Sequence, residues 1–262
     1  MAPKYITKLQ NKRIVIIGGT SGIGFATAEA SIEYGAIVVV ASSQQSKVDQ
    51  AVQRIQTSYP DAKGRISGKT LDLAAPDVEE QVISLFGFAS EHGQHKLDHI
   101  VDTAGGTFRQ IPLSEVTPEK VQDVLQVRLT GGLIVAKIAM RYLNVSPESS
   151  LTVTSGVSDL KPTKGWAIMA PVGSAKKGMM RALAQDMKPI RVNCVCPGAT
   201  KTELFDHFAA DRLEEIMASY RAKTLTGTIG TPEDLAECYL SAMKNCFMTG
   251  VEIYADGGYL LC

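Results

Sequence analysis

A short apolar run followed directly by closely spaced glycines restricts the fold of this chain more than any other feature. Residues 13–18 (RIVIIG) have the composition of a buried strand, and Gly18, Gly22 and Gly24 lead from it into a helical pattern, FATAEASIEYG. Glycines in such a turn let the backbone approach a diphosphate at a helix N-terminus, where free N–H groups and the helix dipole favour negative charge. Taken alone, the loop also fits a purely structural tight turn.

The remaining sequence alternates short β-branched runs with longer helical patterns. We predict strands at 13–18, 36–41, 68–71, 97–104, 150–155, 191–197 and 251–255. We predict helices near 23–34, 46–58, 76–91, 118–143, 173–187 and 232–244. Apolar strands joined by helices indicate a parallel sheet covered on both faces, and the crossovers between parallel strands are right-handed. The predicted fold is therefore α/β, a doubly wound Rossmann fold with a seven-stranded parallel sheet.

The length of 262 residues suits one large domain spanning 1–262. Residues 201–228 are rich in charge and interrupt the alternation just before the last helix and strand. We interpret this stretch as an insertion that covers the substrate.

The charge balance argues against several classes of partner. Lysine plus arginine and aspartate plus glutamate each number 27, and no basic cluster stands out, so we expect no nucleic acid and no membrane. The N-terminal residues lack the apolar core of a signal peptide, and the apolar runs are too short to span a bilayer. We expect a cytoplasmic protein that acts on a small molecule.

The cysteines and histidines indicate neither a disulfide framework nor a metal site. Five cysteines without a CxxC pair suit a reducing compartment, and Cys194 and Cys196 share one face of a predicted strand as core thiols. His92, His95 and His99 are close in sequence, but a glycine and the start of a strand interrupt any helical ligand spacing. No metal is predicted.

Further motifs follow the glycine loop in an order that resembles the short-chain dehydrogenase/reductase family. Asp72 in TLDLAAP matches the acid that holds the adenine, and DTAGG (102–106) matches the NNAG element, with Asp102 and Thr103 replacing both asparagines. RVNCVCPGATKT, TPEDLAE and TGVEIYADGG match later elements, so the resemblance covers essentially the whole chain. It implies a nicotinamide cofactor bound by Gly18, Thr20, Ser21, Gly22, Ile23, Gly24, Asp72, Leu73, Ala104, Gly105, Gly106, Lys176, Pro197, Gly198, Thr200 and Thr202.

The loop after the second strand distinguishes between the two nicotinamide dinucleotides. An NAD enzyme of this kind places an acid there against the ribose 2′-hydroxyl. The sequence here is ASSQQSK, with no carboxylate between Glu33 and Asp49. Ser42, Ser43 and Gln44 offer hydrogen-bond donors without repulsion, which suits a 2′-phosphate. We expect NADP(H), in a loop that lacks the usual arginine.

The chain departs from the family at the catalytic residues, which in its reductases are Asn, Ser, Tyr and Lys. Lys176 is retained, but Val172 stands four residues before it, in place of the tyrosine that protonates the developing alkoxide. Taking Lys177 as the family lysine puts Gly173 at that place instead. The asparagine position is Arg128, a permanent cation that binds anions and cannot relay a proton near neutral pH.

The segment between the fifth strand and the Lys176 helix is expected to lie over the substrate. The family serine corresponds to Ser155 or to Gly156, and the loop SDLKPTKGWAIMAP (158–171) follows. The single tryptophan, Trp166, is either a packing residue or a stacking platform for a flat aromatic ligand such as an indole. Pro171 suits the first turn of the next helix.

Together, the missing tyrosine, the retained lysine, Arg128, Trp166 and Pro171 resemble the fungal indole-alkaloid reductase/Diels–Alderases of the malbrancheamide and paraherquamide type. This resemblance implies NADPH-dependent reduction of a cyclic iminium in a prenylated diketopiperazine-like intermediate to an azadiene. It also implies that the same pocket steers an intramolecular [4+2] Diels–Alder closure to a bicyclo[2.2.2]diazaoctane. Thr163 takes the place of an acid expected near Trp166. The catalytic residues predicted on this basis are Lys176, Arg128, Trp166, Ser155 and Asp159.

Two other functions fit the same residues. One is an ordinary NADP(H)-dependent carbonyl reductase that takes its proton from Asp159, Lys176 or water, and the other is a non-catalytic NADP(H)-binding protein. The residues predicted as pocket walls, each of which also suits ordinary core, are Met169, Leu204, Phe205, Phe208 and Met217. The family leads us to expect a homo-oligomer, a dimer or tetramer, that uses the apolar side chains Met179, Met180, Leu183 and Met187.

Overall fold

The predicted apolar strands form one sheet in which all neighbouring strands run parallel. The computed structural model describes residues 3–105, 110–205 and 210–262. The strand order is β3-β2-β1-β4-β5-β6-β7. The strands are β1 (Arg13–Ile17), β2 (Ile37–Ser42), β3 (Ile66–Thr70), β4 (His99–Asp102), β5 (Ser150–Thr154), β6 (Arg191–Pro197) and β7 (Glu252–Ala255). The prediction of a doubly wound, seven-stranded α/β fold is confirmed.

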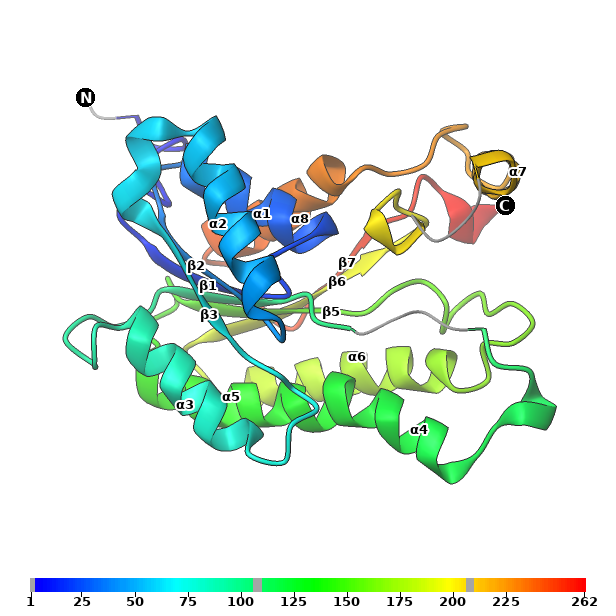
Figure 1. Ribbon diagram of the computed structural model, residues 1–262, viewed down its shortest axis with the longest axis horizontal. Coiled ribbons are helices and arrows are strands. Elements are labelled where there is room, and N and C mark those ends of the chain that lie inside the picture. The colour runs from blue at the N-terminus through cyan, green and yellow to red at the C-terminus, as the bar shows by residue number, and fades with distance from the viewer. Residues whose placement is uncertain (1–2, 106–109, 206–209) are drawn as a thin grey trace.

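Helices cover both faces of the sheet (Figure 1). One side carries α1 (Gly22–Glu33), α2 (Gln45–Ser58) and α8 (Pro232–Lys244). The other side carries α3 (Val78–Ala89), α4 (Pro118–Leu125), α5 (Gly131–Tyr142) and α6 (Met169–Asp186). Within the described ranges, no helix is long and apolar enough to cross a membrane.

The strand order reverses between β1 and β4, and this reversal positions the site. Ile17, the last residue of β1, pairs with Asp102, the last residue of β4. The glycine loop and the DTAGG segment therefore begin side by side at the carboxyl edge of the sheet. Ligands of open α/β sheets bind at this kind of switch point.

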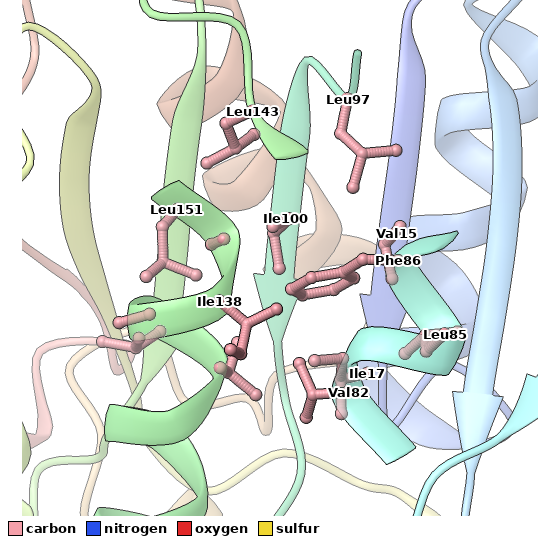
Figure 2. Packing of buried hydrophobic residues seen from close by; sticks show 14 of the residues in the cluster. Val15, Ile17, Val82, Leu85, Phe86, Leu97, Ile100, Ile138, Leu143 and Leu151 are labelled. Atoms are coloured by element: carbon pink, nitrogen blue, oxygen red, sulfur yellow. The ribbon is translucent and has the colours of Figure 1, made fainter. Parts of the chain in front are cut away.

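The core between the sheet and the α3/α5 side is built from aliphatic side chains around one phenylalanine. Figure 2 shows Phe86 of α3 and Ile138 of α5 directed at Ile100 of β4, and all three are fully buried. Burying a side chain of this size contributes about 1.5–3 kcal/mol to folding. This packing holds the strand ends that carry the site in fixed positions.

The predicted helix 118–143 is interrupted in the structure. α4 ends at Leu125, residues Gln126–Thr130 form a turn of π-helix, and α5 begins at Gly131. A π-turn holds more residues than the 3.6-residue period assumes, so a prediction from periodicity extends across it. The residue at the centre of the turn is Arg128, which is 8% exposed.

Two other boundaries differ from the prediction for local reasons. β4 ends at Asp102 rather than at 104, because the Asp102 carboxylate accepts a hydrogen bond from the Ala104 N–H at 3.0 Å and turns the chain. α6 begins at Met169 rather than at 173. Pro171 is therefore in its first turn, where an N–H would have no acceptor within the helix.

Two pairs of sulfur-containing side chains are buried. Met180 and Met187 of α6 are 0% and 2% exposed, so their prediction as oligomerisation surface is wrong and they belong to the core. Cys194 and Cys196 of β6 are also buried, with their sulfur atoms 3.8 Å apart, which confirms them as core thiols on one face of the strand.

The segment predicted as an insertion lies between β6 and α8. Its described part contains a short 3-10 turn, Glu203–Phe205, and the helix α7 (Ala210–Arg221). Further 3-10 turns occur at Pro60–Arg65, Leu113–Glu115 and Tyr259–Leu261.

Candidate functional site

The glycine loop between β1 and α1 has a shape that requires glycine. Gly18 has a φ of +80°, and a Cβ atom on Gly24 would lie 2.3 Å from the Gly18 carbonyl oxygen. The first hydrogen bond within α1 is donated by Phe25, so the N–H groups of residues 22–24 have no acceptor inside the helix. The N–H of Gly22 instead donates to a carboxylate oxygen of Glu203 at 2.8 Å. The start of α1 thus binds the Glu203 carboxylate, which shows that this helix start can bind an anionic group such as a diphosphate.

The other predicted cofactor residues lie in loops at the carboxyl ends of neighbouring strands. Thr20, Ser21 and Ile23 complete the glycine loop; Ser42 ends β2, and Ser43 and Gln44 follow it; Asp72 and Leu73 follow β3; Ala104 and Gly105 follow β4; Pro197 ends β6, and Gly198, Thr200 and Thr202 follow it. Gly106 lies outside the described residues. The structure therefore gathers the described members of this set at one edge of the sheet.

The loop after β2 presents polar side chains to solvent. Ser43 and Gln44 are exposed, and the Gln44 side chain makes no capping hydrogen bond at the start of α2. In the neighbouring loop, the Asp72 carboxylate accepts a hydrogen bond from the Ala74 N–H at 2.9 Å, which holds the turn after β3. These loops offer donors and one fixed acid to an adenosine.

The loop after β6 packs onto the glycine loop. A Cβ atom on Gly198 would lie 2.6 Å from the Cα of Asp256, so the chain passes closely beneath the end of β7. A Cβ atom on Gly22 would lie 3.1 Å from the Thr202 methyl carbon. The Thr202 hydroxyl is buried and makes no hydrogen bond within the described part of the chain, which leaves it available to a ligand in this crevice.

Lys176 faces a buried carboxylate at the end of β4. Its Nζ lies 3.6 Å from Oδ2 of Asp102, and both side chains are 1% exposed. Neither atom makes a hydrogen bond among the residues that the structure describes. Buried polar groups are normally hydrogen-bonded, so this ammonium group retains donors for a ligand such as the hydroxyls of a ribose. The residues present therefore fit a nicotinamide dinucleotide.

Arg128 is turned toward the same place by the π-turn. A Cβ atom on Gly105 would lie 2.7 Å from Nη1 of Arg128, so the guanidinium packs directly on that glycine. Burial lowers the pKa of Arg128 to about 10, an effect that Asp102 opposes. Arg128 is therefore cationic at neutral pH, and Asp102 lies near two cations.

The turn of α6 before Lys176 is apolar. Val172 is 3% exposed and Lys176 is 1% exposed, and their spacing of four residues places them on one side of the helix. The Ser155 hydroxyl donates to the carbonyl oxygen of Gly173 at 3.0 Å. The alternative serine position, Gly156, has no side chain to contribute.

Asp159 is brought together with Lys177 rather than standing alone over the site. The Lys177 ammonium donates to Asp159 at 2.6 Å and to the Tyr254 hydroxyl at 3.0 Å, and the Tyr254 hydroxyl donates to Glu252 at 2.5 Å. Burial lowers the pKa of Lys177, but the hydrogen bonds to Asp159 and Tyr254 outweigh it, so this pKa is above its usual value. The cluster fixes the start of the 158–171 loop to α6 and β7.

Trp166 lies in the middle of that loop and is half-buried. The backbone N–H of Trp166 donates to the Thr163 carbonyl oxygen at 3.2 Å, and the Trp166 carbonyl oxygen accepts from the backbone N–H of Ala170 at 2.9 Å. The neighbouring Gly165 carbonyl accepts from Ile111 at 2.9 Å. The loop is therefore tied to the segment after β4 and to the first turn of α6, while Thr163 is exposed.

The residues predicted as pocket walls have different environments. Met169 and Met217 are 7% and 3% exposed. The Phe205 ring makes an edge-to-face contact with Tyr220, with 6.4 Å between ring centroids. Phe208 and the side chain of Leu204 lie outside the described residues.

Sequence reasoning missed three members of this site: Asp102 as the partner of Lys176, Lys177 as the partner of Asp159, and Glu203 at the glycine loop. The replacement of an asparagine by Asp102 was a visible signal, since a carboxylate in a buried loop requires a cation. For Glu203 no local signal existed, because 181 residues separate it from Gly22.

The chain is similar over its whole length to proteins of one family. The family model of the SDR-like Rossmann domain matches residues 5–262. The short-chain dehydrogenase/reductase ucsE of an Acremonium species is 44% identical over 263 residues, which is 100% of each chain. The structure of MalC Reductase/Diels-Alderase from Malbranchea aurantiaca has 38% identity and a TM-score of 0.93, covering 98% of this chain and 99% of that one. The crystal structure of a small-chain dehydrogenase in complex with NADPH has 28% identity and a TM-score of 0.77, covering 97% of this chain and 100% of that one. The resemblance to fungal alkaloid reductases is thereby confirmed, and the chain belongs to the short-chain dehydrogenase/reductase family of oxidoreductases.

Proposed function

We propose that this oxidoreductase uses NADPH to reduce a cyclic iminium, C=N⁺, in an alkaloid intermediate. The observation that carries the proposal is Val172, which is 3% exposed and stands one helical turn before Lys176. NADPH, when bound, supplies a hydride. Hydride addition to a ketone leaves an alkoxide that must be protonated, whereas addition to an iminium gives a neutral amine. A valine cannot donate a proton, so the iminium is the acceptor that suits this site.

Two tyrosine hydroxyls and the Asp159 carboxylate, which a carbonyl reductase could recruit, are engaged in other hydrogen bonds. The Tyr239 hydroxyl is fully buried and forms a hydrogen bond with the Thr154 hydroxyl, with 2.6 Å between the oxygens. Burial raises the pKa of Tyr239 well above its usual value. The Tyr254 hydroxyl donates to Glu252. Asp159 accepts hydrogen bonds from Lys177 and Ser174. These contacts favour the iminium over the carbonyl alternative.

The choice of NADPH over NADH rests on the loop after β2. Ser43 and Gln44 are exposed there, and no carboxylate accompanies them to repel a 2′-phosphate. The similarity to a dehydrogenase in complex with NADPH supports the same choice. Lys176 grips the nicotinamide ribose, and Thr202 and the glycine loop hold the phosphates.

Arg128 and Trp166 orient the substrate. The Arg128 cation repels an iminium and attracts a carbonyl oxygen, so it faces a carbonyl or anionic part of the ligand. Trp166 offers a flat surface to an indole ring from a loop that is tied at both ends. The described part of the segment after β6, with the turn Glu203–Phe205 and α7, covers the ligand.

In an intermediate with further conjugated C=N and C=C bonds, hydride addition to one C=N⁺ leaves a neutral azadiene, and the same pocket then steers its intramolecular [4+2] closure to a bicyclo[2.2.2]diazaoctane. A cycloaddition needs no acid or base, and a cavity that holds diene and dienophile together removes orientational entropy from the barrier. The similarity to a structure described as a reductase/Diels-Alderase supports this second step. It is the reason to prefer this function over a non-catalytic dinucleotide-binding protein.

Single-turnover oxidation of bound NADPH separates the three functions. The protein is loaded with one equivalent of NADPH and mixed with a preformed cyclic iminium, with a ketone of matched shape, or with buffer. Rapid oxidation with the iminium and little with the ketone supports the proposal. Preference for the ketone indicates a carbonyl reductase, and no oxidation with either indicates a binding protein.

A further inference from the structure

The carboxylate of Glu203 lies at the start of α1, where the proposed function requires the diphosphate of a dinucleotide. Its Oε2 accepts a hydrogen bond from the Gly22 N–H at 2.8 Å, and Gly22 is the first residue of α1. The Gly22 N–H has no acceptor within the helix, and the positive end of the helix dipole lies at the same point. Glu203 therefore gives this helix start the anion that it would otherwise take from a ligand.

A second side chain of this segment packs against the same helix start, so Glu203 does not make the contact alone. Thr202, the residue before Glu203, lies so close to Gly22 that a Cβ atom there would be 3.1 Å from its methyl carbon. The Thr202 hydroxyl is buried without a hydrogen bond to any described residue. This crevice thus holds one N–H donor that an internal acid satisfies and one hydroxyl that nothing described satisfies.

We propose that Glu203 is an internal competitor of the cofactor, a carboxylate that caps α1 in the free protein and must leave when a diphosphate binds. One N–H cannot donate well to both groups, and two anionic groups at one helix start repel each other. The inference rests on the proposed function, because it requires a dinucleotide at the glycine loop.

The contact between Glu203 and Gly22 stabilises the free protein. Breaking it costs the same free energy when the cofactor binds, so cofactor affinity falls by the corresponding factor. A contact that exists only in the free form is lost on binding, and the two effects are equal by thermodynamic linkage. Hydrogen bonds from backbone N–H groups to carboxylates at helix starts have moderate strength. We expect removal of the Glu203 charge to tighten NADPH binding roughly tenfold, which corresponds to about 1.4 kcal/mol.

The position of Glu203 gives this competition a mechanical consequence. Glu203 begins the 3-10 turn Glu203–Phe205 at the start of the segment predicted to cover the substrate. Displacement of its carboxylate frees the first residues of that segment from α1.

The test measures binding rather than turnover. Dissociation constants for NADPH and for adenosine 2′-monophosphate, which has no diphosphate, are determined by calorimetry for wild type, Glu203→Gln and Glu203→Ala. The control is Glu214→Gln, which removes the same charge from α7, where Glu214 pairs with Arg221. Both Glu203 variants should bind NADPH roughly tenfold more tightly. Binding of the monophosphate, and both affinities of Glu214→Gln, should stay within about twofold of wild type.

Thermal unfolding measures how much Glu203 stabilises the free protein. Without cofactor, Glu203→Gln should melt about 2–4 °C below wild type, and with saturating NADPH this gap should close. Unchanged or weaker NADPH binding in both Glu203 variants overturns the competition, as does equal tightening of NADPH and the monophosphate. If neither wild type nor the variants bind NADPH, the proposed function itself fails. That outcome is distinct from equal binding by all proteins, which removes only the role of Glu203.

Discussion

Asp102 and Lys176 form a buried ion pair at the carboxyl edge of the sheet, with 3.6 Å between Oδ2 and Nζ and 1% exposure of each side chain. Asp102 also raises the pKa of Arg128 against the lowering effect of burial. One carboxylate therefore balances the cationic groups of Lys176 and Arg128. The NNAG motif has an asparagine where this chain has Asp102, and the chain also carries Arg128 at the expected position of the catalytic asparagine.

We predict that the two members of this pair depend on one another for stability. Asp102→Asn leaves the Lys176 ammonium buried without its counter-charge, and Lys176→Met leaves the carboxylate, so each should lower the free energy of unfolding by about 3–5 kcal/mol. The double variant should lose clearly less than the sum, because neither the Lys176 ammonium nor the Asp102 carboxylate is then left without the other. Urea unfolding of the cofactor-free proteins measures this coupling. As a control, Glu79→Gln at the surface pair with Lys137 should cost less than about 1 kcal/mol. Additive losses would show that the pair is not coupled.

We predict that NADPH binds more tightly than NADH, and that Ser43→Asp reverses the preference. The new carboxylate would lie where a 2′-phosphate is expected and would repel it, while accepting a hydrogen bond from the 2′-hydroxyl of NADH. A loss of roughly tenfold or more in NADPH affinity is expected, with Ser43→Asn as the uncharged control. Calorimetric titration with both dinucleotides decides the point. Equal affinities in wild type would contradict the assignment of the cofactor.

We predict a homo-oligomer through α5 and α6. Leu133 and Met140 of α5 are 49% and 50% exposed. An apolar cavity between the two helices is lined by Leu129, Leu133, Ala175, Met179, Ala182, Leu183 and Asp186. Leu133→Glu should shift the protein to monomers in light scattering at micromolar concentration, because a buried charge opposes association. Val145→Glu, at a loop position that is 72% exposed, should leave the assembly intact. A monomeric wild type would refute this interface.

The sheet could be predicted from sequence because its strands are continuous apolar runs separated by helical patterns. Strands such as Arg13–Ile17 and Arg191–Pro197 lie within one residue of their predicted ends. The glycine loop could also be predicted from sequence, because the positions of Gly18 and Gly24 have no room for a side chain. In both cases the information lies in residues that are adjacent in sequence.

The site was less predictable where its contacts join distant elements. Arg128 is turned inward by a π-turn that periodicity does not reveal. Asp159 meets Lys177 only because the loop after β5 folds back on α6, and this pairing changes it from a potential acid to an ion-pair partner. Which cation an acid meets is decided by tertiary structure.

We predict a loss of stability in mild acid that originates at His99. Burial, together with the positive charges of Arg191 and Lys12, lowers the pKa of His99 to about 3, and its Nδ1 lies 2.9 Å from the Ser150 hydroxyl. The unfolded chain binds this proton near pH 6.5 and the folded chain does not, so stability is complete above that pH and falls as the pH drops toward 3. At pH 5 the loss amounts to about 2 kcal/mol. His99→Asn should flatten this part of the urea-unfolding profile, and an unchanged slope would refute the assignment.

The absence of a phenol at Val172 is the centre of the proposed chemistry. Val172→Tyr restores a hydroxyl one turn before Lys176, and Val172→Phe adds a ring of similar size without the hydroxyl. Comparing these two variants separates the effect of a proton donor from the effect of volume in a position that is 3% exposed. A phenol that acts as general acid accelerates ketone reduction by about 10²–10⁴-fold.

The deciding measurement is the single-turnover rate of NADPH oxidation by wild type, Val172→Tyr and Val172→Phe with a preformed cyclic iminium and with a ketone of similar shape. Wild type should reduce the iminium roughly tenfold faster than the ketone or more, without the pH dependence of a phenolic acid. Val172→Tyr should not exceed Val172→Phe with the iminium, because no oxyanion forms there. A wild type that prefers the ketone, or a large acceleration of iminium reduction by the tyrosine over the phenylalanine, would contradict the account.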